Sequence, residues 1–330
     1  MSIVIIKPGS HTTIQDLGRW KYQSQGVPVS GAMDEDSLIN ANILLGNDRN
    51  ESCLEISSGN VELKFTMQAI VALCGKGIKA SINALPIPLN KPIQIKADTV
   101  LKFQSTGNGN WIYVSVQGGF DIPKIINSSS TYLPSAFGGW EGRRLKAGDI
   151  LNLNLSNPNE SIFFKETPMD RIFRSTKWGL VNTSKNEPQI RIFQGCEWDW
   201  LTNESKVDIE TKEFIISPDS SRMGFRFTGE RIKRINSQEI ISDAVSKGTI
   251  QLTNEGNLIV LMADGQTIGG YARVAQVAAV DLPALAQQRA GTVVQFKLIS
   301  FEEAEQLFLE REQNRVKLNT SIRLRNKYGN

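Results

Sequence analysis

The chain has 330 residues, more than one ordinary domain usually holds, so two domains are expected. Hydrophobic residues make up 40% and charged residues 22%, which is the composition of a soluble globular protein with a sizeable core. The net charge is +3, and the five basic residues of segment 313–330 leave 3 − 5 = −2 for the rest, which argues against an extended nucleic-acid surface.

Two residue counts exclude further classes of chemistry. His11 is the only histidine, and the cysteines Cys53, Cys74 and Cys196 form no Cys-x-x-Cys pair. A zinc site and a histidine relay to a nucleophile are therefore nearly excluded, and no metal site is predicted. The odd, scattered cysteines indicate reduced, partly buried thiols in a cytoplasmic protein. No apolar run approaches the roughly 20 residues of a membrane helix, so no membrane contact is expected.

Strand signals dominate the chain. Short alternating or β-branched runs, separated by Gly, Pro, Asn and Asp, are typical of barrels and sandwiches. They fall at 2–6, 61–65, 69–73, 93–103, 111–116 and 150–155, and then at 189–193, 213–216, 225–227, 249–252, 258–262 and 292–299. These runs predict a mainly β protein with two β-barrel-like domains and a few short helices.

Helical patterns are few. Residues 34–45 place apolar side chains on one face, with Asp34 suited to the N-cap and Gly46 to the position after the last turn. Residues 281–287 begin with an N-cap residue and a proline in the first turn, which indicates a short helix. Residues 300–309 have the pattern of an amphipathic terminal helix.

The domain boundary is expected near residue 185, because the stretch 152–187, which contains Asn and Pro, separates two strand-rich blocks. The predicted organisation is an N-terminal β domain with a linker (1–185) and a β-barrel domain with a terminal helix (186–312). A basic tail (313–330) follows, and we expect it to be disordered.

The most informative stretch is an apolar strand, 258–262, that runs into a polar loop. The loop contains Asp264, Gln266, Thr267, Gly269, Gly270 and Tyr271. It offers a carboxylate, a carboxamide and a hydroxyl, while its glycines permit positive φ and bring backbone N–H groups close to a ligand. A tight turn with no ligand is an equal alternative, because the loop lacks the spacing of a phosphate loop.

Two further segments carry candidate binding residues. Ser30 and Asp34 lie at the start of the predicted helix, where free N–H groups and the helix dipole favour an anion. Plain capping is the competing interpretation. Arg222 lies in the polar loop 217–225, where its guanidinium could grip a carboxylate or phosphate or simply stay on the surface. Segment 132–144, with aromatic residues among glycines, is typical of a lid or an interface.

Five ordered strings together resemble one family across nearly the whole chain. It is the family of the C subunit of 5-oxoprolinase, also called allophanate hydrolase subunit 2 or biotin-dependent carboxyltransferase. The strings are TTIQDLGR (12–19), GVPVSGAMD (26–34), STYLPSAFGGWEGRRLKAGD (130–149), SPDSSRMGFR (217–226) and ADGQTIGGYARVAQV (263–277). Five motifs in order are far more specific than one glycine-rich loop. The resemblance ends at about residue 312.

The resemblance implies a cyclophilin-like barrel in the second half and an ATP-dependent opening of 5-oxo-L-proline to L-glutamate. It also implies two partners, the B subunit of 5-oxoprolinase in direct contact and the A subunit in the same complex. ATP, with or without Mg²⁺, is expected to bind in the complex with these partners, and the chain alone is expected to be inactive. The substrate would be a small planar amide, and neither nucleic acid nor membrane would be a partner.

The chemistry of a small planar amide suggests roles for the candidate residues. We expect Asp264 to orient the ring N–H or accept its proton, and Arg222 to neutralise phosphate or carboxylate charge, so both are predicted to be catalytic. The predicted substrate-binding residues are Ser30, Asp34, Gln266, Thr267, Gly269, Gly270 and Tyr271. We expect them to line one pocket across the domain junction.

Two alternatives stay open. In urea amidolyases the same pair of domains serves as the carboxyltransferase half that carboxylates urea, so the chain could be the carboxyltransferase component of a biotin-dependent urea or amide carboxylase. It has no biotin-attachment sequence and no recognisable ATP motif, so both would come from partners. The other alternative is a non-catalytic partner that binds and counters a kinase-inhibitor protein.

Overall fold

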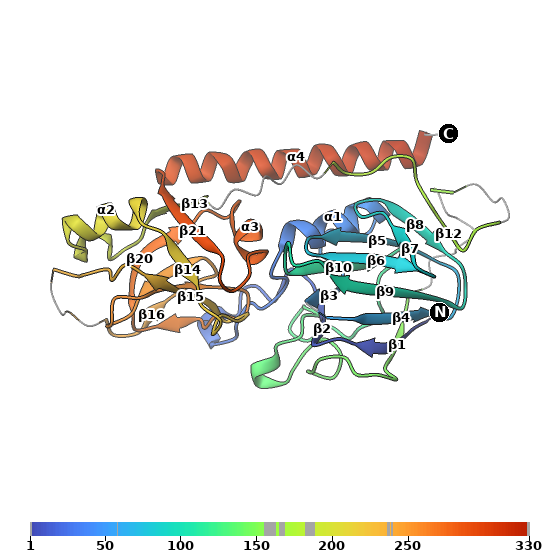
Figure 1. Ribbon diagram of the computed structural model, residues 1–330, viewed down its shortest axis with the longest axis horizontal. Helices are drawn as coiled ribbons and strands as arrows, with labels where there is room; N and C mark the ends of the chain where they lie inside the picture. The colour runs from blue at the N-terminus through green and yellow to red at the C-terminus, as the bar shows by residue number, and fades with distance from the viewer. Residues whose placement is uncertain are drawn as a thin grey trace. The chain divides into compact units, whose positions relative to one another are not determined.

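The computed structural model describes residues 2–57, 59–154, 163–164, 169–181, 189–235, 238 and 240–328. The chain forms two compact units (Figure 1). Unit 1 comprises Met1–Gly18, Asp34–Thr183 and Arg315–Asn330, and unit 2 comprises Arg19–Met33 and Ser184–Asn314. The units differ from the predicted division at residue 185 in two respects. Segment 19–33 belongs to the second unit although it lies near the N-terminus, and segment 315–330 belongs to the first unit.

Unit 1 is built from two six-stranded antiparallel sheets. The first has the order β11 (Ile150–Asn152), β1 (Ser2–Pro8), β4 (Val61–Phe65), β9 (Thr99–Ser105), β6 (Ile78–Ile82) and β7 (Leu85–Ile87). The second has the order β12 (Phe173–Ser175), β8 (Pro92–Ile95), β5 (Ala69–Gly75), β10 (Trp111–Val116), β3 (Cys53–Ser57) and β2 (His11–Gln15). Alternate apolar side chains of both sheets, among them Leu63, Leu73 and Ile112, form one buried cluster.

Helix α1 (Glu35–Leu45) packs against β5 and β10 of the second sheet (Figure 1). Asp34 caps it, because its carboxylate accepts a hydrogen bond from the backbone N–H of Ser37 at 3.0 Å. Gly46 ends it with a φ of 72°, a left-handed conformation that glycine adopts without steric cost. The local signals thus predicted this helix and both of its ends.

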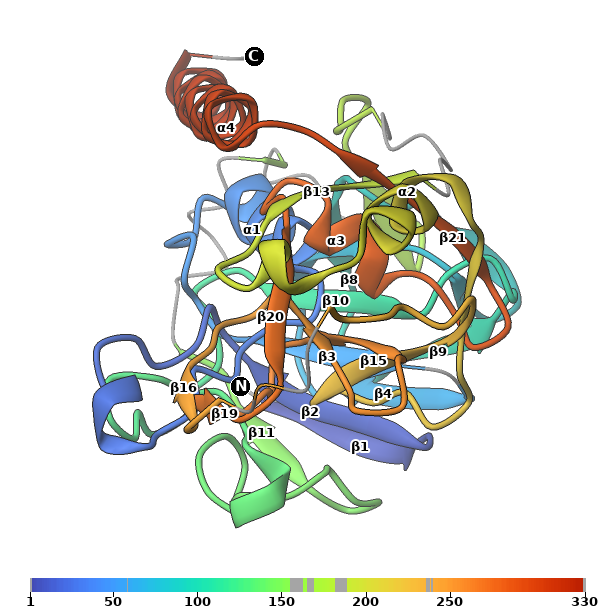
Figure 2. The same cartoon turned by 90° about the vertical axis from the view of Figure 1, so that its left-hand side faces the viewer.

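Unit 2 is a closed seven-stranded barrel, and Figure 2 looks toward this part of the chain. Its strand order is β13 (Gln189–Gln194), β20 (Ala272–Val277), β17 (Thr249–Leu252), β18 (Leu258–Leu261), β15 (Gly224–Gly229), β14 (Phe214–Ile216) and β21 (Val293–Leu298). Parallel pairing of β13 with β21 closes the ring. The predicted mainly β fold is confirmed, with a barrel in the second half and a pair of sheets in the first.

Smaller elements surround the barrel. Helix α2 (Asn203–Thr211) packs against β21, and α3 (Leu282–Ala286) forms the short helix predicted at 281–287. Strands β16 (Asp243–Ala244) and β19 (Ile268–Gly269) form a two-stranded ribbon beside it. Short 3-10 helices lie at Gln23–Gln25 and Trp198–Trp200 in unit 2 and at Leu133–Ser135 in unit 1.

The C-terminal segment is helical, and its predicted disorder is wrong. Helix α4 runs from Phe301 to Tyr328, through most of the basic segment 313–330. The segment 301–328 contains no Gly or Pro and is rich in Glu, Gln, Leu, Arg and Lys, which have high helix propensity. Basic charge alone therefore does not prevent this segment from forming a helix. No helix in the described residues is long and apolar enough to cross a membrane.

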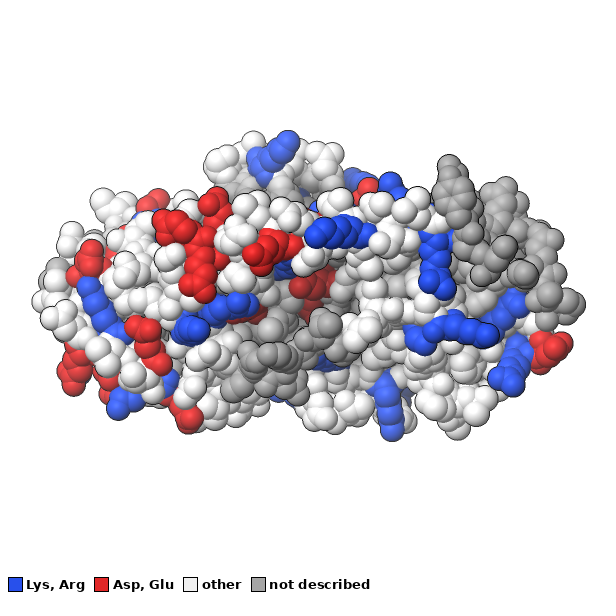
Figure 3. Space-filling view, turned by 90° about the horizontal axis from the view of Figure 1, so that it is seen from above, with Lys and Arg blue, Asp and Glu red and all other residues white. Residues whose placement is uncertain are grey.

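The surface charge is mixed. Figure 3 shows Lys and Arg side chains interspersed with Asp and Glu on the face drawn. Among the described residues of that face, no continuous basic surface appears of the kind that tracks a phosphate backbone.

The three cysteines differ in accessibility, which corrects the expectation that all are partly buried. Cys53 and Cys74 are buried and Cys196 is exposed. Burial raises the pKa of the Cys53 and Cys74 thiols well above the ordinary value, so at pH 8 both stay protonated and unreactive.

We predict that a thiol reagent at pH 8 labels Cys196 rapidly in the native protein and the other two only after unfolding. The time course of labelling, followed by mass spectrometry of the peptides, measures this. Cys196→Ser is the control and should remove the fast phase. Rapid labelling of Cys53 or Cys74 in the native protein would contradict the buried placement.

Candidate functional site

The strand pairing of the barrel brings two predicted site residues together. Strands β15 and β18 are antiparallel neighbours, with Gly224 opposite Leu261. Arg222 precedes β15 and Asp264 follows β18, so both leave the barrel at the same end of the pair. The backbone N–H of Asp264 donates to the carbonyl of Arg222 at 2.8 Å, which fixes the two loops side by side.

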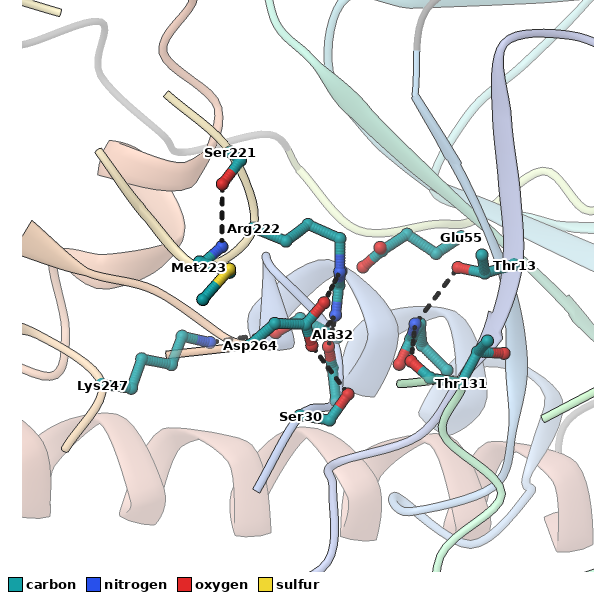
Figure 4. Close-up of polar contacts among 12 residues, drawn as sticks. Thr13, Ser30, Ala32, Glu55, Thr131, Ser221, Arg222, Met223, Lys247 and Asp264 are labelled. Carbon is teal, nitrogen blue, oxygen red and sulfur yellow. Dashed lines mark hydrogen bonds and ion pairs between the residues drawn. The ribbon is translucent and has the colours of Figure 1, made fainter. Parts of the chain in front are cut away.

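The two side chains form a buried, bidentate ion pair (Figure 4). Arg222 Nε donates to Asp264 Oδ2 at 2.7 Å, and Nη2 donates to Oδ1 at 3.0 Å. The side chains are only 7% and 3% exposed. Such fork-to-carboxylate geometry is among the strongest polar contacts in proteins. The surface placement that the sequence left open for Arg222 is therefore wrong.

Segment 19–33 joins this pair within unit 2. Ser30 Oγ donates to Asp264 Oδ1 at 2.8 Å, and Arg222 Nη2 also donates to the carbonyl of Gly31 at 2.6 Å (Figure 4). Ser30 has a φ of 58°, which is unfavourable for a residue with a side chain. The hydrogen bond to Asp264 helps to hold Ser30 in this conformation.

Lys247 is a further member of the cluster that the sequence did not single out. Its Nζ donates to the carbonyl of Ala32 at 2.9 Å (Figure 4). It also donates to the carbonyl of Met33 at 3.2 Å. Lys247 lies just before β17, in a loop with no motif of its own. Three sequence-distant loops and segment 19–33 thus converge on one cluster around Asp264.

The cluster limits what Asp264 can do chemically. Its carboxylate accepts three hydrogen bonds, two from Arg222 and one from Ser30. Both carboxylate oxygens are therefore already engaged by donors of the cluster. Either predicted catalytic role therefore requires the pair to open or a ligand to use the remaining acceptor position on Oδ2.

The rest of the 264–271 loop runs to the surface. Gln266 and Gly270 are exposed and Tyr271 is 40% exposed. The carbonyl of Thr267 accepts from the N–H of Val245 at 3.0 Å, and Gly269 lies in the β16–β19 ribbon. Gly265, Gly269 and Gly270 do not have positive φ, so that part of the expectation for these glycines is wrong. At Gly269 an added Cβ would lie 2.4 Å from Gln251 Nε2, so a side chain there would displace the Gln251 carboxamide.

Asp34 belongs to unit 1, whereas the Asp264 cluster belongs to unit 2. The two carboxylate oxygens of Asp34 accept from the N–H of Ser37 at 3.0 Å and from Ser37 Oγ at 2.6 Å. Both contacts are those of a helix cap, the interpretation that competed with anion binding. The pocket predicted to unite Asp34 with Asp264 stays a prediction.

Unit 1 holds a buried polar row that the sequence did not reveal. Thr13, Glu55 and Tyr113 stand opposite one another on β2, β3 and β10, and all are 0% exposed. Tyr113 Oη donates to Glu55 Oε2 at 2.7 Å, and burial beside Glu55 raises the pKa of the phenol well above its usual value. Gln15 Nε2 donates to Thr13 Oγ1 at 3.1 Å. The only sequence signal is polar residues inside strands.

Segment 132–144 is tied into unit 1. Its backbone forms a bridge between Tyr132 and Phe137, whose rings lie 5.6 Å apart. Arg143 is bidentate to Asp149, with 2.8 and 2.9 Å hydrogen bonds, and lowers the pKa of that carboxyl.

Among the described residues, no group of three or more His, Cys, Asp or Glu could hold a metal ion.

Comparisons with known proteins give consistent matches. The family model "Carboxyltransferase domain, subdomain A and B" matches residues 25–298. The chain is 34% identical over 322 residues to the C subunit of 5-oxoprolinase from Haemophilus influenzae, covering 98% of both chains. It is 29% identical over 320 residues to the urea amidolyase of Saccharomyces cerevisiae, covering 93% of this chain and 17% of that protein.

The fold is also that of a solved structure. The crystal structure of the Kluyveromyces lactis urea amidolyase matches with a TM-score of 0.85 and 27% identity. The match covers 96% of this chain and 20% of the amidolyase chain. This chain therefore corresponds to a small part of the amidolyases but to nearly the whole length of the Haemophilus influenzae protein.

Proposed function

Because this chain belongs to the carboxyltransferase domain family, we propose that it is the C subunit of an ATP-dependent 5-oxoprolinase, which opens 5-oxo-L-proline to L-glutamate. One observation carries the proposal. The Haemophilus influenzae relative, named as this component of 5-oxoprolinase, is 34% identical and is matched over 98% of its length. The enzyme would be a cyclic amide hydrolase, and this chain would be one component of it.

The proposal includes partners. The relatives are named as one lettered subunit of 5-oxoprolinase, which supports a multi-subunit enzyme. We place the B subunit in direct contact with this chain and the A subunit in the same complex. Three free cysteines support a reducing, cytoplasmic setting for this complex.

The proposal also places ATP on a partner. The cations of the Asp264 cluster do not fit a phosphate site, because Arg222 and Lys247 already bond to a carboxylate and to backbone carbonyls. A phosphate group would have to break these buried contacts before either cation could neutralise its charge. The nucleotide is therefore expected on another chain of the complex.

Within this proposal the Arg222–Asp264 pair has a positioning role in its closed form. It joins the start of the 264–271 loop to Ser30 and Gly31 and so fixes where this loop leaves the barrel. Pre-organised loops of this kind present donors and acceptors to a substrate without reorganisation during the reaction.

We expect turnover of 5-oxoproline with ATP only when the chain is co-purified with the A and B subunits. The chain alone should be at least about 10²-fold slower, since the proposal places ATP on a partner and holds Asp264 in an ion pair. Glutamate formation, measured by mass spectrometry with each component omitted in turn, tests this. Full turnover by the isolated chain, or none by the complete complex, would contradict the proposal.

A second candidate function is urea carboxylation, which the similarity to the urea amidolyases favours. It predicts urea-dependent use of bicarbonate and ATP when a biotinylated carboxylase partner is supplied. The same complexes should be assayed with both substrates under identical conditions. Turnover with urea but not with 5-oxoproline would replace the first proposal. Stable partner binding without turnover of either substrate would favour the non-catalytic alternative.

A further inference from the structure

The barrel strand β17 contains one buried polar residue among apolar neighbours. Gln251 is 1% exposed and lies between Ile250 and Leu252, which are equally buried. The pairing of β17 with β20 shifts register between Ile250 and Gln251. Such a bulge re-aims a side chain and often lies beside a functional site. The alternation of Ile250, Gln251 and Leu252 is typical of a strand with one solvent-facing side, so only the structure reveals that Gln251 is buried.

The carboxamide of Gln251 is only half satisfied. Its Oε1 accepts from Gln266 Nε2 at 3.5 Å, the outer limit of a hydrogen bond. Its Nε2 is buried and has no hydrogen-bond partner in the part of the chain that the structure describes. A single contact between two carboxamides satisfies one end of each, whichever end is nitrogen. One buried polar atom of Gln251 is therefore left for another group.

Gly269 creates the space around this carboxamide. A Cβ at this position would lie 2.4 Å from Gln251 Nε2 and 3.1 Å from Gln266 Nε2. The carboxamides of Gln251 and Gln266 therefore lie against Gly269, where a side chain would interfere with both of them. Gln266 is exposed, so its side chain has room to turn into solvent. That rotation releases Oε1 of Gln251 and leaves both ends of a buried carboxamide free to bind.

We propose that Gln251 binds the cis-amide edge of the substrate through two hydrogen bonds, and that Gln266 occupies this position as a latch in the absence of ligand. The substrate N–H would donate to Oε1, and the substrate carbonyl would accept from Nε2. A five-membered lactam holds its N–H and carbonyl cis, which matches the paired donor and acceptor of a carboxamide. The choice of a lactam rests on the proposed function.

The test uses the assembled complex and a ligand that needs no ATP. Binding of 2-pyrrolidinone is followed by ligand-observed NMR and compared with N-methyl-2-pyrrolidinone and γ-butyrolactone, which lack the N–H. We expect the wild-type complex to bind 2-pyrrolidinone about 10-fold or more tightly than either analogue, the scale of one or two neutral hydrogen bonds. Equal binding of all three, or none at concentrations far above the KM for 5-oxoproline, would overturn the proposal.

Variants separate the two glutamines. Gln251→Leu should lose about 10-fold or more in affinity for 2-pyrrolidinone with little change for the N-methyl analogue. Gln251→Glu keeps the shape and removes the donor, so it should show a similar loss even if the leucine variant folds poorly. Gln266→Ala removes the latch and should bind more tightly than wild type. A loss in Gln266→Ala equal to that in Gln251→Leu would overturn the latch.

Two experimental outcomes separate the amide site at Gln251 from the proposed 5-oxoprolinase activity. Binding of 2-pyrrolidinone that depends on Gln251, without turnover of 5-oxoproline, would keep the amide site and reject the 5-oxoprolinase. Turnover of 5-oxoproline that Gln251→Glu leaves unchanged in KM and kcat would keep the enzyme and reject Gln251 as a substrate-binding residue.

Discussion

Asp264→Asn and Arg222→Met are each expected to lower the free energy of unfolding by about 3–5 kcal/mol, because each leaves a buried charge or polar partner without its counterpart. The two residues are 2% and 8% exposed, so water cannot replace the missing group. Urea denaturation followed by circular dichroism measures the change. A loss below about 1 kcal/mol would mean that the pair behaves like an exposed one.

The double variant Arg222→Met/Asp264→Leu separates structure from function. With both charges removed, much of the lost stability should return, as it does when a buried ion pair is replaced by apolar residues of similar volume. Turnover of the complex should nevertheless stay at least about 10²-fold low, because the double variant can no longer hold Ser30 and the 264–271 loop together. If turnover returned with stability, the pair would have no role at the site.

Arg191 and Asp281 provide a matched control in the same unit. They also form a bidentate pair, at 2.9 and 2.6 Å, but the side chains are 33% and 10% exposed. Asp281→Asn should therefore cost less stability than Asp264→Asn, since solvent screens the remaining charge. Turnover should be unchanged, because this pair lies outside the Asp264 cluster.

Gly142→Ala is expected to destabilise unit 1 by about 3–5 kcal/mol, at the upper end of what one substitution does. Gly142 has a φ of 66°, and a Cβ there would lie 2.0 Å from the carbonyl oxygen of Ala136. Because backbone cannot rotate out of the way as a side chain can, the 132–144 loop has to shift. Thermal unfolding measured by calorimetry tests the prediction.

Gly148→Ala is the control for backbone strain alone. Gly148 has a φ of 91°, yet nothing lies within 4 Å of an added Cβ. It should cost only the roughly 1–2 kcal/mol of a left-handed residue with a side chain. If Gly142→Ala cost no more than Gly148→Ala, the 132–144 loop would yield easily, as a lid does. A much larger cost would identify it as a fixed part of unit 1.

The elements with local causes could be predicted from sequence. Helix α1 was predictable because Asp34 and Gly46 mark its ends and its apolar residues follow the helical period. Most strands of the barrel were predictable from alternating or continuous apolar runs. Helix α4 was missed beyond residue 309, because its positive charge was weighed more heavily than the helix propensity of its residues.

The candidate site could be predicted only as separate parts. The loops around Ser30, Arg222 and Asp264 stood out as three polar or glycine-rich segments, but their joining did not. Ser30 and Asp264 are 234 positions apart, and no local pattern specifies such a contact. Gln251 and Lys247 did not stand out in the sequence at all. A single polar residue in a strand, or just before one, gives no local signal that it belongs to a site.

The sequence by itself determined helix α1, many of the strands and the family to which the chain belongs, because these depend on local order and motifs. Tertiary structure decided which strands are neighbours, and with them the contacts that give the site residues their properties. The pairing of β15 with β18 places Arg222 beside Asp264, and the folded barrel brings Gln251 of β17 to Gln266. In a sequence, an aspartate whose carboxylate is open to a ligand cannot be distinguished from one whose carboxylate is held in an ion pair. They differ only in the donors that the folded chain brings to them.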